Sequence, residues 1–234
     1  MGRALARKMA ARGDRLFVLG RNVDDLARSI RDLEAHAGGG EIPHAYCDLM
    51  DPSSFVPSLD RADEVLEGFD TVVLTAGVFA TQEQLEKDPE LCRRLLIVNH
   101  AHSVVFLEEA RRRLLARGGG TLCAFSSVAG DRARNPVVIY GSAKAGLSHY
   151  LEGLDHKFRA AGLRVVCVKP GFVRTGMTAG LDSPPFAGEP DAVADVVLKA
   201  IDGGRPVVYA PPVWRWIMAV IRGLPRVVMR KVGF

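Results

Sequence analysis

Short runs of hydrophobic residues alternate along the chain with longer stretches in which apolar residues recur at helical spacing. Several runs are almost continuously apolar, which is typical of parallel strands buried on both faces. Strands that alternate with helices predict right-handed βαβ units and a three-layer, doubly wound α/β fold. The predicted strands are residues 16–19, 42–47, 71–75, 121–125, 165–168 and 206–209. The predicted helices lie near residues 3–12, 22–36, 53–67, 82–117, 138–161 and 190–202.

The length of 234 residues suits one α/β domain. Hydrophobic residues make up 48% of the chain, enough for a full core and far from the composition of a disordered protein. Neither an internal repeat nor a linker is visible, so we expect no second domain. Residues 176–189 are rich in Gly, Pro and Ser, and this composition is typical of a loop.

The net charge of +4 is distributed unevenly. The last thirty residues contain no Asp or Glu, so the segment carries +6 and the rest of the chain −2. The main body therefore gives no sign of binding nucleic acid. The six cations are Arg205, Arg215, Arg222, Arg226, Arg230 and Lys231.

The four cysteines form no Cys-x-x-Cys pair, which argues against a disulfide framework or a zinc site. Three of them lie in apolar, strand-like runs and are interpreted as buried thiols. The six histidines do not stand at metal-ligand spacing with a carboxylate, so no metal site is expected. The N-terminus is predicted to be an amphipathic helix rather than a signal peptide, which favours the cytoplasm.

Tyr140 and Lys144 are four residues apart, so on a helix they share one face. A nearby ammonium can lower the pKa of a phenol, which is about 10 when unperturbed. Such a phenol can exchange a proton with a carbonyl or an alcohol near neutral pH. Ser127 lies thirteen residues earlier, beyond the run Thr121–Phe125, where a strand would present its hydroxyl to the same substrate oxygen. Taken alone, a Tyr-x-x-x-Lys pair is more often an ordinary pair on a helix surface.

With Ser127 at this spacing, the chain resembles the short-chain dehydrogenase/reductase family, which carries a Ser followed by Tyr-x-x-x-Lys. The resemblance covers roughly residues 2–210 and implies a Rossmann-type dinucleotide-binding catalytic domain over residues 1–210. Residues 211–234 would form a basic tail, either within that domain or as an appendage to it. Further segments resemble family motifs in the right order: Leu19–Asn22, Cys47–Asp51, Thr75–Gly77, Val98–His100 and Pro170–Thr175.

The front of the chain departs from the family pattern. The family opens with a strand and a Gly-rich loop that binds the cofactor pyrophosphate. Here Gly2 fits the last glycine of that loop and residues 3–12 fit the first helix, so the first strand and most of the loop are missing. We therefore expect a gap in the middle of the sheet, with unpaired backbone groups on both sides. A start codon placed too far downstream, a clipped chain and a natural truncation with impaired cofactor binding all stay open.

The resemblance implies a role for each catalytic candidate. Tyr140 would be the general acid in reduction or the general base in oxidation, and Lys144 would lower its pKa and hold the nicotinamide ribose. Ser127 would bind the substrate carbonyl and stabilise the developing alkoxide. Asn99 would hold a water in a proton relay to the lysine. Ser126 is the nearest competitor for the serine role, but the spacing favours Ser127.

The resemblance also implies a dinucleotide site. Arg21 follows the second strand, where a guanidinium suits a 2′-phosphate, so NADP(H) is favoured and NAD(H) stays open. Asp48 would accept a hydrogen bond from the adenine amino group; alternatively, it caps a helix or forms an Asx turn. Asp24 and Asp25 are interpreted as dipole partners at a helix start. The remaining cofactor candidates are Gly2, Leu49, Thr75, Ala76, Gly77, Tyr140, Lys144, Pro170, Gly171, Val173 and Thr175.

The C-terminal tail combines aromatic, apolar and basic residues between Pro211 and Arg230, and Pro225 would break a continuous helix there. A basic amphipathic helix suits a membrane interface, and its longest apolar run is too short to span a bilayer. The alternative is a helix that completes the substrate pocket or a dimer contact. The tail is also loosely similar to that of short-chain reductases that act on polyprenyl-phosphate sugars.

Together, the residues and the resemblance predict an NAD(P)(H)-dependent oxidoreductase that interconverts a ketone or aldehyde and an alcohol. The substrate would be a small molecule, and the family analogy favours a homo-oligomer. One alternative is a cofactor-impaired protein of this fold with a binding or regulatory role. Another is a membrane-peripheral reductase of a lipid-linked keto-sugar.

Overall fold

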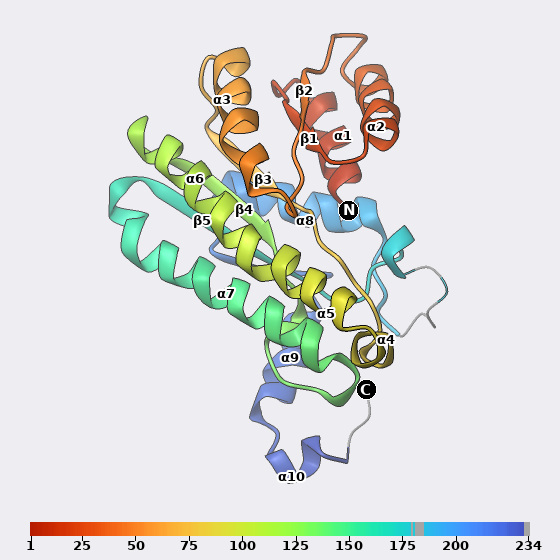
Figure 1. Cartoon of the computed structure of the whole chain (residues 1–234). Coiled ribbons are helices and arrows are strands. Elements are labelled where there is room, and N and C mark those ends of the chain that lie inside the picture. The colour runs from red at the N-terminus through yellow and green to blue at the C-terminus, as the bar shows by residue number, and fades with distance from the viewer. Residues whose placement is uncertain (179, 181–184, 232–234) are drawn as a thin grey trace.

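The computed structural model describes residues 1–178, 180 and 185–231. All strand pairs are parallel, as predicted for an α/β fold, and the sheet lies between layers of helices (Figure 1). The strands are β1 (Val18–Gly20), β2 (His44–Tyr46), β3 (Thr71–Leu74), β4 (Gly120–Phe125), β5 (Leu163–Pro170) and β6 (Val207–Ala210). The longer helices are α1 (Gly2–Arg12), α2 (Val23–His36), α3 (Phe55–Leu66), α6 (His102–Ala116), α7 (Val138–Phe158) and α8 (Pro190–Gly203).

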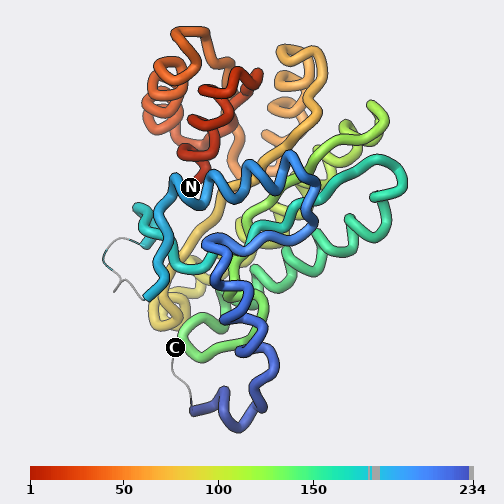
Figure 2. Tube along the Cα trace, turned by 180° about the vertical axis from the view of Figure 1, so that it is seen from behind, coloured from red at the N-terminus to blue at the C-terminus, as the bar shows by residue number. Residues whose placement is uncertain are grey.

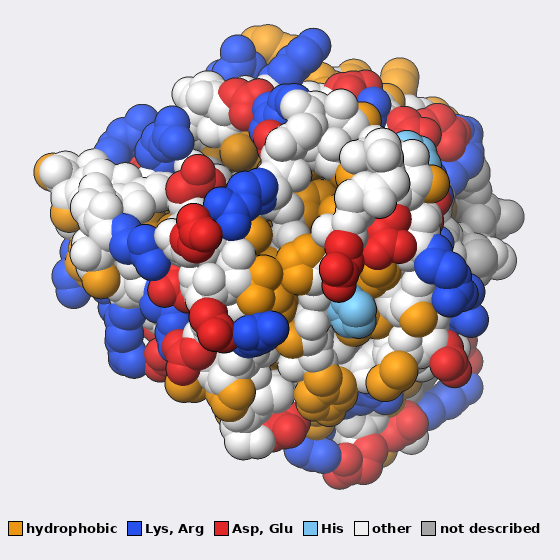
Figure 3. All heavy atoms as spheres, turned by 90° about the horizontal axis from the view of Figure 1, so that it is seen from above, with side chains coloured by type: hydrophobic (Ala, Val, Ile, Leu, Met, Phe, Trp, Pro, Cys, Tyr) orange, Lys and Arg blue, Asp and Glu red, His pale blue; other side chains and the backbone are white. Residues whose placement is uncertain are grey.

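The sheet is divided into two parts. β1 pairs only with β2, whereas β3, β4, β5 and β6 pair in that order. Between β1 and β3 lies a cavity of about 1050 Å³, lined by both strands and by α1. Figure 3, the view from above, shows a hollow in the molecular surface with hydrophobic side chains inside it. The gap expected in the sheet is therefore present in the described residues.

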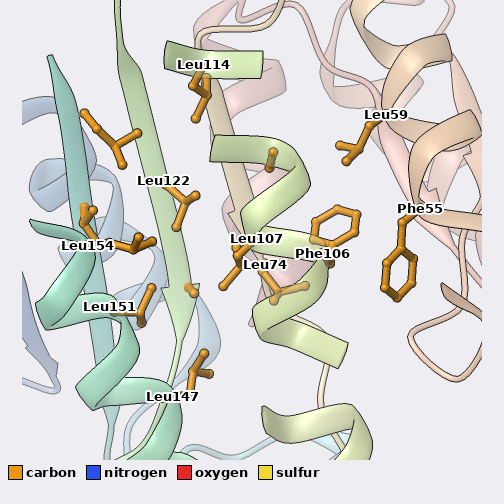
Figure 4. Close-up of a cluster of buried hydrophobic side chains, with 14 of the residues drawn as sticks. Phe55, Leu59, Leu74, Phe106, Leu107, Leu114, Leu122, Leu147, Leu151 and Leu154 are labelled. Atoms are coloured by element: carbon orange, nitrogen blue, oxygen red, sulfur yellow. The ribbon is translucent and has the colours of Figure 1, made fainter. Parts of the chain in front are cut away.

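One large core cluster fixes the helices α3, α6 and α7 on one face of the sheet (Figure 4). Two buried leucines on α6, Leu107 and Leu114, lie about two turns apart and face the sheet. On α7, the buried Leu147 and Leu151 lie about one turn apart and also face the sheet. They meet Leu122 of β4 between them. A second cluster packs α1 and α8 against the opposite face of β4, β5 and β6.

The single helix predicted over residues 82–117 is wrong, because the segment is interrupted twice. It forms α4 (Gln82–Lys87), α5 (Pro89–Leu96), a π-helical turn (Ile97–Ala101) and then α6. Asp88 ends α4 and its carboxylate accepts hydrogen bonds from the first backbone amides of α5, while Pro89 fits only a first helical turn. A π turn is a local irregularity without a residue signature of its own, so a prediction from periodicity does not place it.

The tail forms α9 (Trp214–Gly223) and α10 (Arg226–Met229), and the break at Pro225 is confirmed. In the part of the chain that the structure describes, no helix is both long and apolar enough to cross a membrane. The loop predicted over residues 176–189 contains one short 3-10 turn (Gly176–Thr178). Residues 179 and 181–184 of that loop lie outside the described residues.

Candidate active site

Ser127 lies just beyond the carboxyl end of β4, as predicted. It begins a 3-10 turn (Val128–Gly130), and its Oγ accepts a hydrogen bond from the backbone amide of Ala129 at 3.1 Å. This bond fixes the hydroxyl at the edge of the sheet where parallel α/β proteins bind their ligands.

Two glycines let α7 approach this turn closely. A Cβ on Gly141 would lie 2.8 Å from the Ala129 carbonyl oxygen, and a Cβ on Gly130 would lie 2.7 Å from the backbone of α7. Because neither position carries a side chain, α7 brings the Tyr140 phenol next to the Ser127 side chain. The structure thus brings Ser127 and Tyr140 together, and the sequence gives no direct sign of the glycine contacts that allow it.

Lys144 is buried one turn further along α7. Its Nζ donates a hydrogen bond to the Phe125 carbonyl oxygen at 2.9 Å, at the end of β4. Burial lowers the pKa of Lys144 to about 8, because a buried ammonium loses its hydration. The ammonium therefore lies beside the same strand end as Ser127.

The prediction that Lys144 lowers the pKa of Tyr140 is wrong for this structure. Burial raises the pKa of Tyr140 to about 12, and only the hydrogen bond with Ser127 acts in the opposite direction. The ammonium points to the Phe125 carbonyl, and its nitrogen lies 5.9 Å from the centroid of the phenol ring. In this arrangement desolvation of both groups outweighs their mutual influence.

Phe79 is a site residue that sequence reasoning missed. Its ring meets that of Tyr140 edge to face, with centroids 5.1 Å apart. Gln82 holds the start of α7, the helix that carries Tyr140, because its Oε1 accepts a hydrogen bond from the Ile139 amide at 3.1 Å. Both residues follow the Thr75–Gly77 motif closely, but no spacing rule connects them to Tyr140.

Asn99 is fully buried in the π-helical turn, where such irregularities often mark functional sites. Its side-chain amide donates to the Val78 carbonyl at 2.6 Å and accepts from the Val78 amide at 2.8 Å. Asn99 therefore holds the loop that follows β3. A Cβ on Gly77 of that loop would lie 3.0 Å from Asn99 Oδ1 and 3.6 Å from Lys144 Nζ. The water relay stays a prediction.

Ser126 has a different environment from Ser127. Its Oγ donates to the Lys144 carbonyl oxygen at 2.8 Å and lies 2.7 Å from Ser148 Oγ. The residue is buried between β4 and α7, so its hydroxyl serves the packing of the helix. This supports Ser127 for the serine role.

The cavity between β1 and β3 is lined by the residues that are predicted to hold the adenosine half of a dinucleotide. Gly2 packs directly against the end of β3, because a Cβ there would lie 2.4 Å from Thr75 Oγ1. The helix α1 consequently begins at the carboxyl edge of the sheet. The predicted cofactor residues around this cavity are Gly2, Arg21, Asp48, Leu49, Thr75, Ala76 and Gly77.

Asp48 forms the Asx turn that was the alternative to adenine binding. Its Oδ1 accepts a hydrogen bond from the Met50 amide at 2.9 Å. Asp24 and Asp25 lie in the first turn of α2, where Asn22 Oδ1 accepts from the Asp25 amide at 2.9 Å. The position at a helix start that their interpretation requires is therefore confirmed, and the role as partners of the helix dipole stays a prediction.

The segment after β5 lies apart from that cavity. A Cβ on Gly171 would lie 2.0 Å from Trp214 Nε1, so the indole of the tail covers this glycine. The neighbouring Val173 is buried, and the Thr175 amide donates to Thr178 Oγ1 at 3.0 Å. Pro170, at the end of β5, completes this group of predicted residues, and α9 thus contacts the predicted nicotinamide side.

A buried polar cluster near the site was also missed. Asp131 accepts a hydrogen bond from Lys169 Nζ at 2.6 Å and from the Tyr209 hydroxyl at 2.7 Å. Burial and the adjacent carboxylate raise the pKa of Tyr209. The cluster joins the turn after Ser127 to β5 and β6, and three residues so far apart in sequence leave no local signal.

The structure thus places a Ser, a Tyr and a Lys at one strand end of a parallel sheet, as the resemblance implied. Residues 1–185 match the model of the short chain dehydrogenase family. The chain is 32% identical to an uncharacterized oxidoreductase of Mycobacterium tuberculosis over 99% of its own length and 92% of that protein. It is 34% identical to an uncharacterized oxidoreductase of Streptomyces coelicolor, over 99% and 91% of the two chains.

Among solved structures, a short-chain type dehydrogenase/reductase from Mycobacterium ulcerans has the same fold, with a TM-score of 0.80. The two chains are 24% identical, and the match covers 89% of this chain and 82% of the other. The protein belongs to the short-chain dehydrogenase/reductase family.

Proposed function

We propose that the protein interconverts a ketone or aldehyde and the corresponding alcohol, with NADP(H) as the favoured cofactor and NAD(H) as the alternative. The observation that carries this proposal is the meeting of Ser127, Tyr140 and Lys144 at the carboxyl end of β4. Membership of the family supports hydride chemistry with a nicotinamide cofactor.

In this proposal the cofactor, when bound, supplies or accepts the hydride. Tyr140 donates its phenolic proton to the carbonyl oxygen during reduction and takes it back during oxidation. Ser127 donates a hydrogen bond to the same oxygen as negative charge develops there. Lys144, buried beside them, can return a proton to the phenolate that remains.

The preference for NADP(H) depends on Arg21. This exposed residue follows β1 at the edge of the cavity, where its guanidinium can pair with a 2′-phosphate. The cavity around Gly2, Thr75 and Gly77 suits the adenosine half, and the glycine at residue 77 leaves room for a close approach of ligand to Lys144.

The test is NADPH consumption by the purified protein with a panel of ketones and aldehydes, compared with the Tyr140→Phe variant. We expect the variant to lose roughly 10²- to 10⁴-fold in turnover, because the phenolic proton is gone. Since the ring remains against Phe79, NADPH binding and the melting temperature should stay close to wild type. Turnover retained by Tyr140→Phe would exclude this mechanism.

A second candidate is a non-catalytic binding or regulatory protein of the same fold. The divided sheet favours it, because the gap between β1 and β3 removes rigid support from the cofactor edge. Binding of neither NADPH nor NADH by a folded sample would favour this candidate. Assembly into a homo-oligomer, a lipid-linked keto-sugar as substrate and membrane contact through residues 211–234 also stay proposals.

A further inference from the structure

We propose that the outer side of α9 and α10 docks on the surface of an anionic lipid membrane. This tail surface consists of the exposed residues Trp216, Val220, Val227 and Val228 together with the surrounding arginines. The inference goes beyond the reaction proposed above and does not depend on it.

The inner side of the tail is fixed to the body. Met218 and Ile221 of α9 and Met229 of α10 are buried in one cluster with Val128. Arg132 adds a polar contact, because its guanidinium donates to the Leu224 carbonyl oxygen at 2.8 Å. Since both helices direct their buried residues into the same cluster, their exposed residues lie on the side facing away from the body.

That outward side is strongly apolar. Trp216 is 70% exposed, Val220 67% and Val227 64%. Trp216 and Val220 stand four residues apart on α9 and share one face. A helix that is apolar both toward the core and toward the solvent needs a second apolar partner for its outer face.

The charges around these residues identify the chemistry of the partner. Five cations and no Asp or Glu occur from Pro211 to the end of the chain. Within the described residues none of the five forms a salt bridge, whereas cations elsewhere, such as Arg12 and Arg113, do. The Arg215 guanidinium lies 5.7 Å from the Trp216 ring centroid, so cation and aromatic ring occupy one surface.

An anionic membrane satisfies both properties of the tail surface. Arginines attract acidic headgroups, while an indole and valines enter the interface between headgroups and acyl chains. A two-fold contact between copies of the chain would instead place one set of these arginines against the other set. The tail lies at the end of the molecule opposite α2 and α3 in both views, so the body leaves it accessible (Figures 1 and 2).

Vesicle co-sedimentation of the full chain tests the proposal. Vesicles of phosphatidylcholine alone are compared with vesicles in which about a quarter of the lipid is phosphatidylglycerol. We expect binding to the anionic vesicles, loss of binding at high salt, and little binding to the neutral vesicles. Absence of binding to anionic vesicles, or equal binding to both kinds, would overturn the proposal.

The double variant Trp216→Ser/Val220→Ser should reduce the bound fraction at least about tenfold, because it removes apolar area that would enter the interface. The matched control, Tyr46→Ser/Val23→Ser, removes one aromatic and one valine that are exposed elsewhere and should bind like wild type. Circular dichroism checks that both remain folded. If the tail variant binds like wild type, or changes only the oligomeric mass in light scattering, the membrane is not the partner.

Discussion

At the scale of single residues, the absence of two side chains determines how α7 meets the turn after Ser127. Gly130 and Gly141 lie at the contact, and each would place a Cβ within 3 Å of backbone atoms. Backbone atoms cannot move aside as the end of a flexible side chain can. The distance between Tyr140 and Ser127 is therefore sensitive to a single methyl group.

We predict that Gly141→Ala destabilises the protein by about 1–3 kcal/mol and lowers turnover, because its methyl group would press on the Ala129 carbonyl. Gly153→Ala on the same helix is the matched control. That position is exposed with open space around it, so alanine should stabilise by about 0.5–1 kcal/mol through helix propensity. Denaturant unfolding of both variants measures the effects; equal shifts would contradict the close-contact explanation.

Burial of Lys144 predicts a dependence of stability on pH. Burial lowers its pKa to about 8 from an ordinary value of 10.5. Between these pH values the unfolded chain binds a proton that the folded chain lacks, so stability rises with pH. Relative to Lys144→Met, wild type should gain up to about 3 kcal/mol in unfolding free energy between about pH 7 and pH 10. Parallel denaturant titrations check this, and a difference that is constant with pH would refute it.

The sequence predicted the meeting of the candidate catalytic residues better than their pKa values. Helix periodicity and the end of an apolar run are local properties, and together with the family resemblance they placed Ser127, Tyr140 and Lys144 at one strand end. The pKa values depend on burial and on which carbonyl the ammonium meets, and these come from packing between β4 and α7. The positions of Phe79 and Trp214 are long-range contacts and left no local pattern.

At the scale of elements, the apolar runs predicted all six described strands. The signal is clearest for β4 and β5, because strands buried on both faces leave an almost continuous hydrophobic run. The strand boundaries differ by a few residues: β5 extends to residues 163–170, since it pairs with a neighbour on each side. β1 and β2 have only three residues each and pair only with one another. The predicted helix over residues 82–117 is interrupted at Pro89 by the Asp88 cap and again by the π turn, and neither interruption follows from the apolar pattern.

The unpaired edges of β1 and β3 predict that an added strand would stabilise the protein. An apolar segment of about six β-branched residues with a glycine-rich loop, fused before Met1, would run parallel between them and fill the cavity. We expect a gain of at least about 2 kcal/mol, or about 4–8 °C in melting temperature. Hydrogen exchange should slow in residues 18–20 and 71–74.

The control for this extension carries prolines at alternate strand positions, which cannot donate to a ladder. Its melting temperature should match that of the unextended chain. If the two extensions stabilise equally, the gain comes from something other than strand pairing.

At the scale of the whole molecule, two parts meet at the cofactor edge. The part formed by α1, β1, α2 and β2 carries Gly2 and Arg21 of the residues expected to bind adenosine, and the four-stranded part carries Thr75–Gly77 and the proposed catalytic residues. The cavity separates them inside the sheet. If the two parts together bind one dinucleotide, the oxidoreductase is favoured. If they bind none, the non-catalytic binding protein of the same fold is favoured.

The most direct measurement is therefore calorimetric titration of the full chain with NADPH and with NADH, alongside Arg21→Ser. We predict that NADPH binds at least about tenfold more tightly than NADH, and that Arg21→Ser removes the difference by deleting a charge-assisted contact to the 2′-phosphate. Equal affinities in wild type would contradict the role of Arg21. A folded protein that binds neither nucleotide would contradict the proposed oxidoreductase activity itself.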